Sequence, residues 1–555
     1  MPGTHSVGTQ QELPLQCINP LQLVADLLEK FTIFGVSNTD SGLFSQFVDE
    51  DRPPRLMRIL PLFLLLLFSA TGFVCGQEQW LVEANRLTVE FRQNLDTLAK
   101  KCDDGGLSDA ATKIRLCVPP QNEEKIYIPK LPIKILQKTP ADNKPAEKKS
   151  GMFDWEAELW EMRRTYANKL FVCAKAAAKR DRGSVAMQMA LAALHANPDH
   201  PEVRNLLGFR RYNNEEWRTA WEADRLKKGY VDHPRFGWIL EKNVKRYEAG
   251  ERLNGKKWVN EKEDRHLRQI ITKGWKIESE HYALITNHSI EEGVRLSRKL
   301  EDLYRAWKLL FYRYMASDEG LATLFEGKGK PKPGKKHDII VFRDRDDYVS
   351  TLSRKIPFAP QTLGFYTSDL KRCFFFTVGN KVTWSEREEV DRTLLHEATH
   401  QLFSESRPTS ELTALAYNFW IIEGIAMYME TLRSEGDYYV VGGADDIRFD
   451  NAMEEALDSK FYVPMELLVK LGRPPFQNSP KIQELYSQSA GLAHFFMHAD
   501  GGAYRDATVN YLRLVYEDKD EQDTLEILTK KSYAELDELY IDYLKDKAKN
   551  VAVHE

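Results

Sequence analysis

Apolar residues recur at the spacing of an α-helix along much of this chain. The pattern is helical over residues 77–117 and again over 151–250. Between them, residues 118–150 are rich in proline and lysine, a composition typical of an extended linker. We therefore expect a helical segment, a linker and a second helical module in the first half of the chain.

Part of the second helical module resembles a tetratricopeptide helix pair. The resemblance depends on small and apolar residues from Ala190 to Ala220, among them Leu194, Gly208 and Trp217. A tetratricopeptide solenoid needs about three units, and the sequence has one clear unit. The module is expected to be a degenerate helical region that either binds a partner protein or serves only in packing.

Strand patterns follow the second helical module. Asn254 and Gly255 form a dipeptide typical of a tight hairpin turn. Residues 282–286 and 338–342 predict strands, and residues 290–315 between them have the periodicity of an amphipathic helix. This part of the chain is therefore expected to combine strands with helices.

The next predicted helix carries the candidate chemistry. Ser385 with Glu388 predicts a capping box at its start, and Pro408 forbids its continuation. Within this helix, His396 and His400 are four residues apart, so their side chains differ by about 40° in direction and project from one face. Two imidazoles so arranged are able to bind the same metal ion.

Glu397 and Glu423 complete a pattern typical of metal-assisted hydrolysis. Glu397 lies about 100° round the helix from His396, where it can reach a metal-bound water without being a ligand. Glu423 lies on a second apolar, helix-like stretch at about 419–432, and it is the third protein ligand that a hydrolytic zinc site needs. The alternative interpretation is two core histidines and a surface glutamate.

The chain here resembles the gluzincin metallopeptidases, whose pattern is His-Glu-x-x-His plus a distant glutamate in Trp-x-x-Glu-Gly-x-Ala. The second element stands in this sequence as residues 420–426. The resemblance covers residues 276–545 and is to aminopeptidase N-like enzymes and to peptidase-MA-like proteins with a tetratricopeptide-like region ahead of the catalytic domain. It implies an α+β fold, with a mostly helical N-terminal region and a two-lobed, thermolysin-like zincin domain. In that domain His396, His400 and Glu423 would hold Zn²⁺ in the cleft between the lobes.

The resemblance implies roles for two further residues. Glu430, about two turns beyond Glu423, would orient a histidine ligand through the other ring nitrogen; the alternative is a solvated surface glutamate. Tyr486 would stabilise the oxyanion with its hydroxyl, as the tyrosine of a Tyr-x-Lys-Gly segment does in aminopeptidase N relatives. Gln488 and Ser489 replace the lysine and glycine of that segment.

One segment of the aminopeptidase N relatives is missing from this sequence. They carry Gly-x-Met-Glu-Asn ahead of the zinc helix, and it captures the free amine of the substrate. Residues 364–366 and 373–378 stand in that region and predict a β-hairpin, which either pairs with an extended peptide beside the cleft or is buried in the core. We therefore expect an endopeptidase rather than an aminopeptidase.

A rival pair of histidines is found later in the chain. His494 and His498 are also four residues apart, but Phe495, Phe496 and Met497 lie between them and no general base accompanies them. The run is typical of a core helix, and a second metal site is the alternative.

Composition and charge narrow the range of partners. The chain has 555 residues, 42% of them hydrophobic, and a formal net charge of −5, which suits a multidomain globular protein. It has no strongly basic face and no nucleic-acid motif, so no nucleic-acid partner is expected. Cys102 and Cys117 flank a glycine-containing loop and are expected to form a disulfide, while Cys173 and Cys373 are expected to be free and buried.

The start of the chain predicts export. An apolar run at residues 59–68 follows Arg58 and predicts a signal peptide at 57–76. The run is shorter than the roughly 20 residues of a membrane span, so no stable span is expected after cleavage. Residues 1–56 do not have the pattern of a folded domain and are interpreted as an extension ahead of the real start; the alternative is a cytoplasmic tail on a signal anchor.

These patterns together predict an exported zinc peptidase, periplasmic, in the cell envelope or secreted, that acts on peptides or proteins. Zinc would activate a water, and Glu397 would take the proton of that water and deliver it to the leaving amine. A second hypothesis is a non-catalytic envelope scaffold whose helical module binds proteins. A third is hydrolysis of a non-peptide amide.

Overall fold

The computed structural model describes residues 55–554, apart from 119, 121, 137–153, 329–333, 379–383 and 444–445. The chain divides into two units, 1–77 and 78–555. Residues 1–54 of the expected extension lie outside the described residues, and the expected signal peptide, 57–76, belongs to the first part of helix α2 (Arg55–Asp104). None of the helices in the described part of the chain combines the length and apolar character that crossing a bilayer requires.

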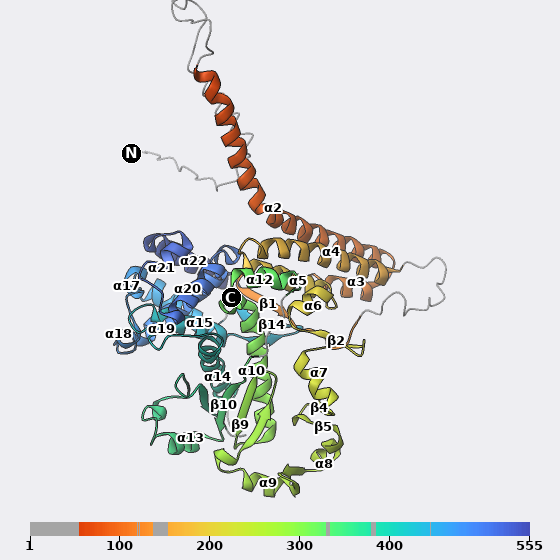
Figure 1. The fold of residues 1–555 in the computed structure, drawn as a ribbon, viewed down its shortest axis with the longest axis vertical. Helices are drawn as coiled ribbons and strands as arrows, with labels where there is room; N and C mark the ends of the chain where they lie inside the picture. Colours follow the sequence, from red (N-terminus) through yellow and green to blue (C-terminus); the bar gives the residue numbers. More distant parts are fainter. Residues whose placement is uncertain are drawn as a thin grey trace, which may run out of the picture. The chain divides into compact units, whose positions relative to one another are not determined.

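Packed helices form the first part of the second unit, and they confirm the helical prediction for 77–117. They are α2, α3 (Ser108–Arg115), α4 (Trp155–Ala178), α5 (Gly183–Ala196), α6 (Pro201–Leu206) and α12 (Asp318–Phe325). Their apolar faces form one buried cluster, in which Phe91 of α2 stacks on Tyr166 of α4 with ring centroids 4.2 Å apart. Figure 1 shows α2 and α4 lying side by side in this layer.

The expected linker contains a strand. β1 (Lys125–Pro129) pairs antiparallel with β14 (Tyr438–Gly442), and β13 (Arg433–Glu435) completes a three-stranded sheet. The linker prediction was therefore wrong for β1. Its pairing partner, β14, lies about 310 residues further along the chain. A local sequence pattern therefore cannot predict this pairing.

Three short hairpins follow α6, and the first two lie where further helices were predicted. In chain order the elements are β2 (Arg210–Tyr212), β3 (Glu216–Arg218), α7 (Ala220–Lys227), β4 (Tyr230–His233), β5 (Gly237–Leu240), η1 (Glu241–Asn243), α8 (Val244–Glu248), β6 (Glu251–Asn254), β7 (Lys257–Asn260) and α9 (Glu261–Leu267). The helical prediction for 151–250 is therefore wrong beyond Leu206, and the tetratricopeptide-like stretch is α5, α6 and the first hairpin. The hairpin predicted at Asn254 and Gly255 is confirmed as β6 and β7.

The hairpins are units of an internal repeat. Gly208, Gly229 and Gly250 stand 21 residues apart, and all three have positive φ, at 96°, 77° and 85°, a conformation that favours glycine. The carbonyls of Gly229 and Gly250 each accept a backbone hydrogen bond from the first residue after the next hairpin, Glu241 and Glu261, at 2.9 Å. The second and third units are thus closed by the same contact, which the helical interpretation missed.

A five-stranded mixed sheet forms the centre of the second unit. Its order is β11 (Gly364–Thr367), β12 (Arg372–Phe376), β10 (His337–Phe342), β9 (Tyr282–Thr286) and β8 (Trp275–Glu278). The three central strands run parallel, and the two edge strands are antiparallel to their neighbours. The predicted strands and the β-hairpin are confirmed. Within the hairpin, β12 is buried in the core and β11 is the edge strand.

Alternate residues of the sheet face two different cores. Ile339 and Val341 of β10 belong to the main core with α10 (Ile290–Leu310) and α14 (Trp384–Glu405), whereas Ile340 and Phe342 pack with α13 (Arg345–Leu352) on the other face. This is the twofold alternation of a strand. The helix predicted over 290–315 is confirmed as α10 followed by α11 (Tyr312–Met315).

The helix that carries His396 and His400 is α14. It begins at Trp384, so Ser385 lies inside its first turn and not ahead of it, and it ends at Glu405, before Pro408.

The remaining C-terminal elements are mostly helices. They are α15 (Phe419–Glu430), α16 (Ile447–Met453), η4 (Glu454–Asp458), α17 (Met465–Leu468), α18 (Arg473–Gln477), α19 (Ile482–Gly502), α20 (Arg505–Glu517), α21 (Thr524–Thr529) and α22 (Tyr533–His554), with 3-10 turns η2 (Ile271–Lys273) and η3 (Ala359–Gln361) earlier in the chain. Every residue of α15 is buried, and Figure 1 shows α15 among these helices and next to α14. The fold is α+β, as predicted.

The expected disulfide does not form. Cys102 and Cys117 are both free: Cys102 is fully buried at the end of α2, and the Cys117 thiol donates to the carbonyl of Lys113 at 3.4 Å. The prediction was wrong because the Cys102 side chain packs in the apolar cluster of the helices, whereas the Cys117 thiol bonds to the backbone of α3. Cys173 and Cys373 are buried free thiols.

Candidate metal centre

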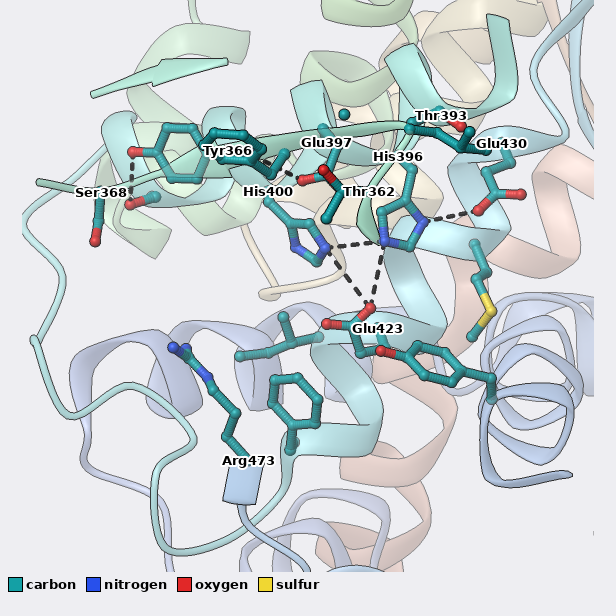
Figure 2. Close-up of a pocket in the computed structure, with 18 of the residues that line it drawn as sticks. Thr362, Tyr366, Ser368, Thr393, His396, Glu397, His400, Glu423, Glu430 and Arg473 are labelled. Atoms are coloured by element: carbon teal, nitrogen blue, oxygen red, sulfur yellow. Dashed lines mark hydrogen bonds and ion pairs between the residues drawn. The ribbon is translucent and has the colours of Figure 1, made fainter. Parts of the chain in front are cut away.

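Two helices carry the predicted site residues toward one another. His396 and His400 lie one turn apart on α14, and Glu423 and Glu430 lie two turns apart on α15. The two helices are held in place because the apolar face of α14 packs on the sheet and α15 is buried on all sides. Figure 2 shows both imidazoles directed at the Glu423 carboxylate.

Three donor atoms meet at the centre of the site. The Nε2 atoms of His396 and His400 lie 3.1 Å apart, and Oε2 of Glu423 lies 3.3 Å from the first and 3.8 Å from the second. Ligands of a tetrahedral ion with bonds of about 2.0–2.2 Å are separated by roughly 3.3–3.6 Å. The donor set therefore fits one shared metal ion.

The electrostatics of this centre favour a positive charge between the donors. Burial acts to raise the pKa of Glu423, but the neighbouring His400 and His396 outweigh burial and hold that pKa far below its usual range. Burial likewise acts to lower the pKa of His396, yet hydrogen bonds with Glu423 and Glu430 raise it well above the ordinary value. The carboxylate thus remains ionised. It favours a positive charge beside it, either a proton on an imidazole or a metal ion.

Glu430 holds the far side of the His396 ring. Its Oε1 lies 2.7 Å from Nδ1, and because an ionised carboxylate only accepts, Nδ1 carries a proton and Nε2 is the ring nitrogen that faces Glu423. Its Oε2 accepts from Nε of Arg448 at 3.3 Å. Glu430 is 5% exposed, so the alternative of a solvated surface glutamate does not hold.

Glu397 lies beside the donor set and takes no part in it. Its Oε2 accepts the backbone N–H of Tyr366 at 2.8 Å, which fixes the carboxylate against edge strand β11. Burial is the largest influence and raises the pKa of Glu397, with the two imidazoles acting in the opposite direction. A carboxylate with a raised pKa is better matched to taking a proton and then releasing it.

Tyr486 lines the same cleft as the donor set. Its ring packs edge-on against Phe476, with ring centroids 5.4 Å apart. Burial raises its pKa, and the charges of Glu423 and Glu397 raise it further, so the phenol is neutral and able to donate. No hydrogen bond joins its hydroxyl to the three donors.

Gln488 explains one departure from the family segment. Its side-chain oxygen accepts the N–H of Val463 at 2.9 Å, and its nitrogen donates to the Val463 carbonyl at 2.7 Å. This residue therefore ties α19 to the segment before α17 and does not face the metal centre.

The cleft around the centre has a volume of about 2270 Å³. Its walls come from β11, α14, α15, α16, α18 and α19. A cleft of this size is larger than the usual pocket for a small molecule, which is about 300–1,000 Å³.

The rival histidine pair is part of the core. His498 donates from Nδ1 to the carbonyl of Glu123 and accepts from the Tyr428 hydroxyl, both at 2.9 Å, and His494 bonds to the Tyr543 hydroxyl at 2.8 Å. Burial lowers the pKa of His498 well below its usual value. In the described part of the chain, the one metal-capable group of three is that of α14 and α15.

Sequence reasoning missed two partners of the site, the Tyr366 backbone amide and the Arg448 guanidinium. A backbone N–H is present whatever the residue type, so the sequence cannot indicate it. Arg448 belongs to no motif with a fixed spacing from the other site residues. Neither the protein-family models nor the curated proteins include a match to this chain.

Proposed function

We propose that this protein is an exported zinc-dependent peptidase that hydrolyses bonds within peptides. The observation that carries the proposal is the convergence of His396, His400 and Glu423 on one point, with the Glu397 carboxylate beside them. Two histidines and a carboxylate are the donor set of many hydrolytic zinc sites, which leave a fourth position open for water. A purely structural site needs no adjacent base.

The residues divide the chemistry as follows. A Zn²⁺ ion held by the three donors supplies a Lewis acid and a water of lowered pKa. Glu397 takes the proton of that water and returns it to the leaving amine. The Tyr486 hydroxyl donates to the oxygen on which negative charge develops, and Glu430 keeps His396 in the ligating tautomer.

The proposal of endopeptidase action is supported by edge strand β11 beside Glu397. Edge strand β11 lies where aminopeptidase N relatives carry their amine-binding segment, and its register with β12 is antiparallel. Strand β11 is an edge strand, and Glu397 accepts its Tyr366 N–H; the rest of this edge supports binding of an extended peptide by β-augmentation. We further assign the sheet with α10 and α14 to one lobe of a zincin and α15 to α22 to the other, with the cleft between them.

Export is proposed from the apolar segment at 59–68, and the compact second unit starts at Glu78, next to the expected cleavage site. The helical layer of α2 to α6 is the part we propose for contact with a protein partner. N-terminal sequencing of the mature protein tests export: a mature chain that begins at Gln77 supports it, and one that keeps residues 57–76 contradicts it.

The central test pairs metal analysis with digestion of a peptide library. Wild-type protein is expected to bind close to one equivalent of zinc and to cleave peptides internally, and a chelator should abolish cleavage. Glu397→Gln should keep the zinc and lose about 10²–10⁴-fold in kcat. Glu466→Gln, on an exposed residue of α17, is the control and should behave as wild type.

Three results would speak against the proposal. Undiminished cleavage by Glu397→Gln rejects the mechanism. Zinc binding without chelator-sensitive cleavage of any peptide favours the scaffold or an amide substrate of another class. Absence of zinc binding removes the basis of the proposal.

A further inference from the structure

Four arginines line the cleft, and one of them differs from the rest. Three are neutralised by acidic side chains, in the pairs Arg392 with Asp446, Arg407 with Glu517, and Arg448 with Glu430. Arg473, the fourth, has no acidic partner among the residues that the structure describes. Its one side-chain hydrogen bond runs from Nη2 to the Thr413 carbonyl at 3.4 Å. A guanidinium has five N–H donors, so most of its capacity is directed at the cleft.

Arg473 lies beside the first turn of α15, the helix that carries the proposed metal ligand Glu423. The carbon at the centre of its guanidinium is 5.6 Å from the ring centre of Phe419. Phe419 precedes Glu423 by four residues on α15, so the two lie on one face, one turn apart. Figure 2 shows the Arg473 side chain extending from α18 toward the His400 side of Glu423.

The backbone of Arg473 is firmly held. Its N–H donates to the Ala414 carbonyl at 2.9 Å. The preceding residue, Gly472, packs so closely on the backbone of Leu415 and Ala416 that an added Cβ would overlap it. The base of the side chain is therefore fixed while its charged end is exposed.

We infer that Arg473 binds a carboxylate of the substrate and so selects which bond reaches the metal centre. The inference rests on the proposed function, since it concerns the same cleft. A guanidinium matches a carboxylate with two parallel hydrogen bonds, which gives geometric specificity as well as attraction. The carboxylate is either the C-terminus of the peptide or an aspartate or glutamate side chain.

The first experiment measures binding, without turnover. Zinc-loaded Glu397→Gln protein is titrated calorimetrically with straight-chain probes that carry a hydroxamate at one end and either a carboxylate or a carboxamide at the other, over a series of chain lengths. The hydroxamate anchors at the metal. At the fitting length, the carboxylate probe should bind about tenfold more tightly than its carboxamide twin. The added change Arg473→Gln should reduce that ratio to about one.

Lys371 provides the matched control. It also lines the cleft, is exposed, and has no acidic partner among the described side chains, but it lies at the turn between β11 and β12. Lys371→Gln should keep the tenfold ratio. Equal binding of the two probes at every length, or loss of the ratio in Lys371→Gln, overturns the role of Arg473. If neither probe binds to zinc-loaded protein, the metal centre itself fails, and the inference fails with it.

The second experiment identifies the source of the carboxylate. Wild-type protein and Arg473→Gln are compared on peptide pairs that end in a free carboxylate or an amide, and on pairs with glutamate or glutamine at one internal position. Loss of preference for the free terminus in Arg473→Gln assigns the C-terminus, and loss of preference for glutamate assigns an acidic side chain. Cleavage by wild type with no preference in either pair contradicts the inference and leaves the proposed peptidase activity intact.

Discussion

Replacement of Gly424 by alanine is expected to damage the metal centre through the backbone. Gly424 follows Glu423, the proposed metal ligand, on α15, at a position where α15 lies against the backbone of α19. A Cβ added at this glycine would lie 2.5 Å from the Ser489 carbonyl oxygen and 3.3 Å from the Ala493 Cβ. The first contact is about 0.9 Å shorter than an ordinary van der Waals contact, and a backbone carbonyl cannot rotate away.

The magnitude follows from two opposing terms. Overpacking of a core costs typically about 1–3 kcal/mol, whereas alanine stabilises a helix interior by about 1 kcal/mol over glycine. The difference is a net loss of about 0–2 kcal/mol, and we expect the upper end because no flexible side chain can absorb the clash. Relief requires α15 to shift by several tenths of an ångström. A metal site tolerates deviations of only about 0.2 Å in ligand distance, so zinc affinity should fall by at least about tenfold.

Two assays separate the effects, with Gly491→Ala as the control. Gly491, on α19, faces Tyr540 and Ala452, away from Gly424, and an added Cβ there would also overlap its neighbours. Both variants should melt at lower temperature, but only Gly424→Ala should lose zinc to a competing chelator at lower chelator concentration. A Gly424→Ala protein that melts lower and yet keeps wild-type zinc affinity refutes the link between this helix contact and the metal centre.

Two further predictions concern side chains around the site. Glu430→Gln should lower zinc affinity about 10–100-fold in a chelator competition, because a neutral amide oxygen accepts the Nδ1 proton of His396 more weakly than a carboxylate and leaves the ring less basic; unchanged affinity would show that the ring needs no such charge. The ion pairs of Arg295 with Glu292 and Asp391 should make stability pH-dependent. Burial acts to raise the pKa of both carboxyls, but hydrogen bonds from Arg295 outweigh it and both pKa values are lowered. The stabilisation by these ion pairs is complete above about pH 4, near the pKa of Asp and Glu in the unfolded chain. It is lost as the pH falls through the lower pKa values of the folded state. The drop in melting temperature below pH 4 should therefore be smaller in Arg295→Met.

The donor residues could be predicted from the sequence because their arrangement is local. The four-residue interval of His396 and His400 fixes a shared helix face whatever else the chain does. Glu423 was predicted from its apolar surroundings and the family pattern. The distance between these two helices was not predictable, because it depends on contacts such as that of Gly424 with Ser489.

The hairpin repeat shows where local periodicity fails. Residues 210–250 were predicted to be helical, yet they contain short strands of only three or four residues. A search for self-similarity would have found the interval of 21 residues between Gly208, Gly229 and Gly250. Positive φ at a regular interval indicates turns, and turns at that interval exclude long helices.

Helix α15 gives the strongest physical argument for a functional centre. It buries all twelve of its residues, and two of them are glutamates. A buried carboxylate is costly unless it is paired. Glu430 has Arg448 and His396 as partners, whereas the partners of Glu423 are two imidazoles, whose charge depends on their protonation. An apolar residue at position 423 would pack at lower cost, so the carboxylate is explained by what it holds and not by the stability of the fold.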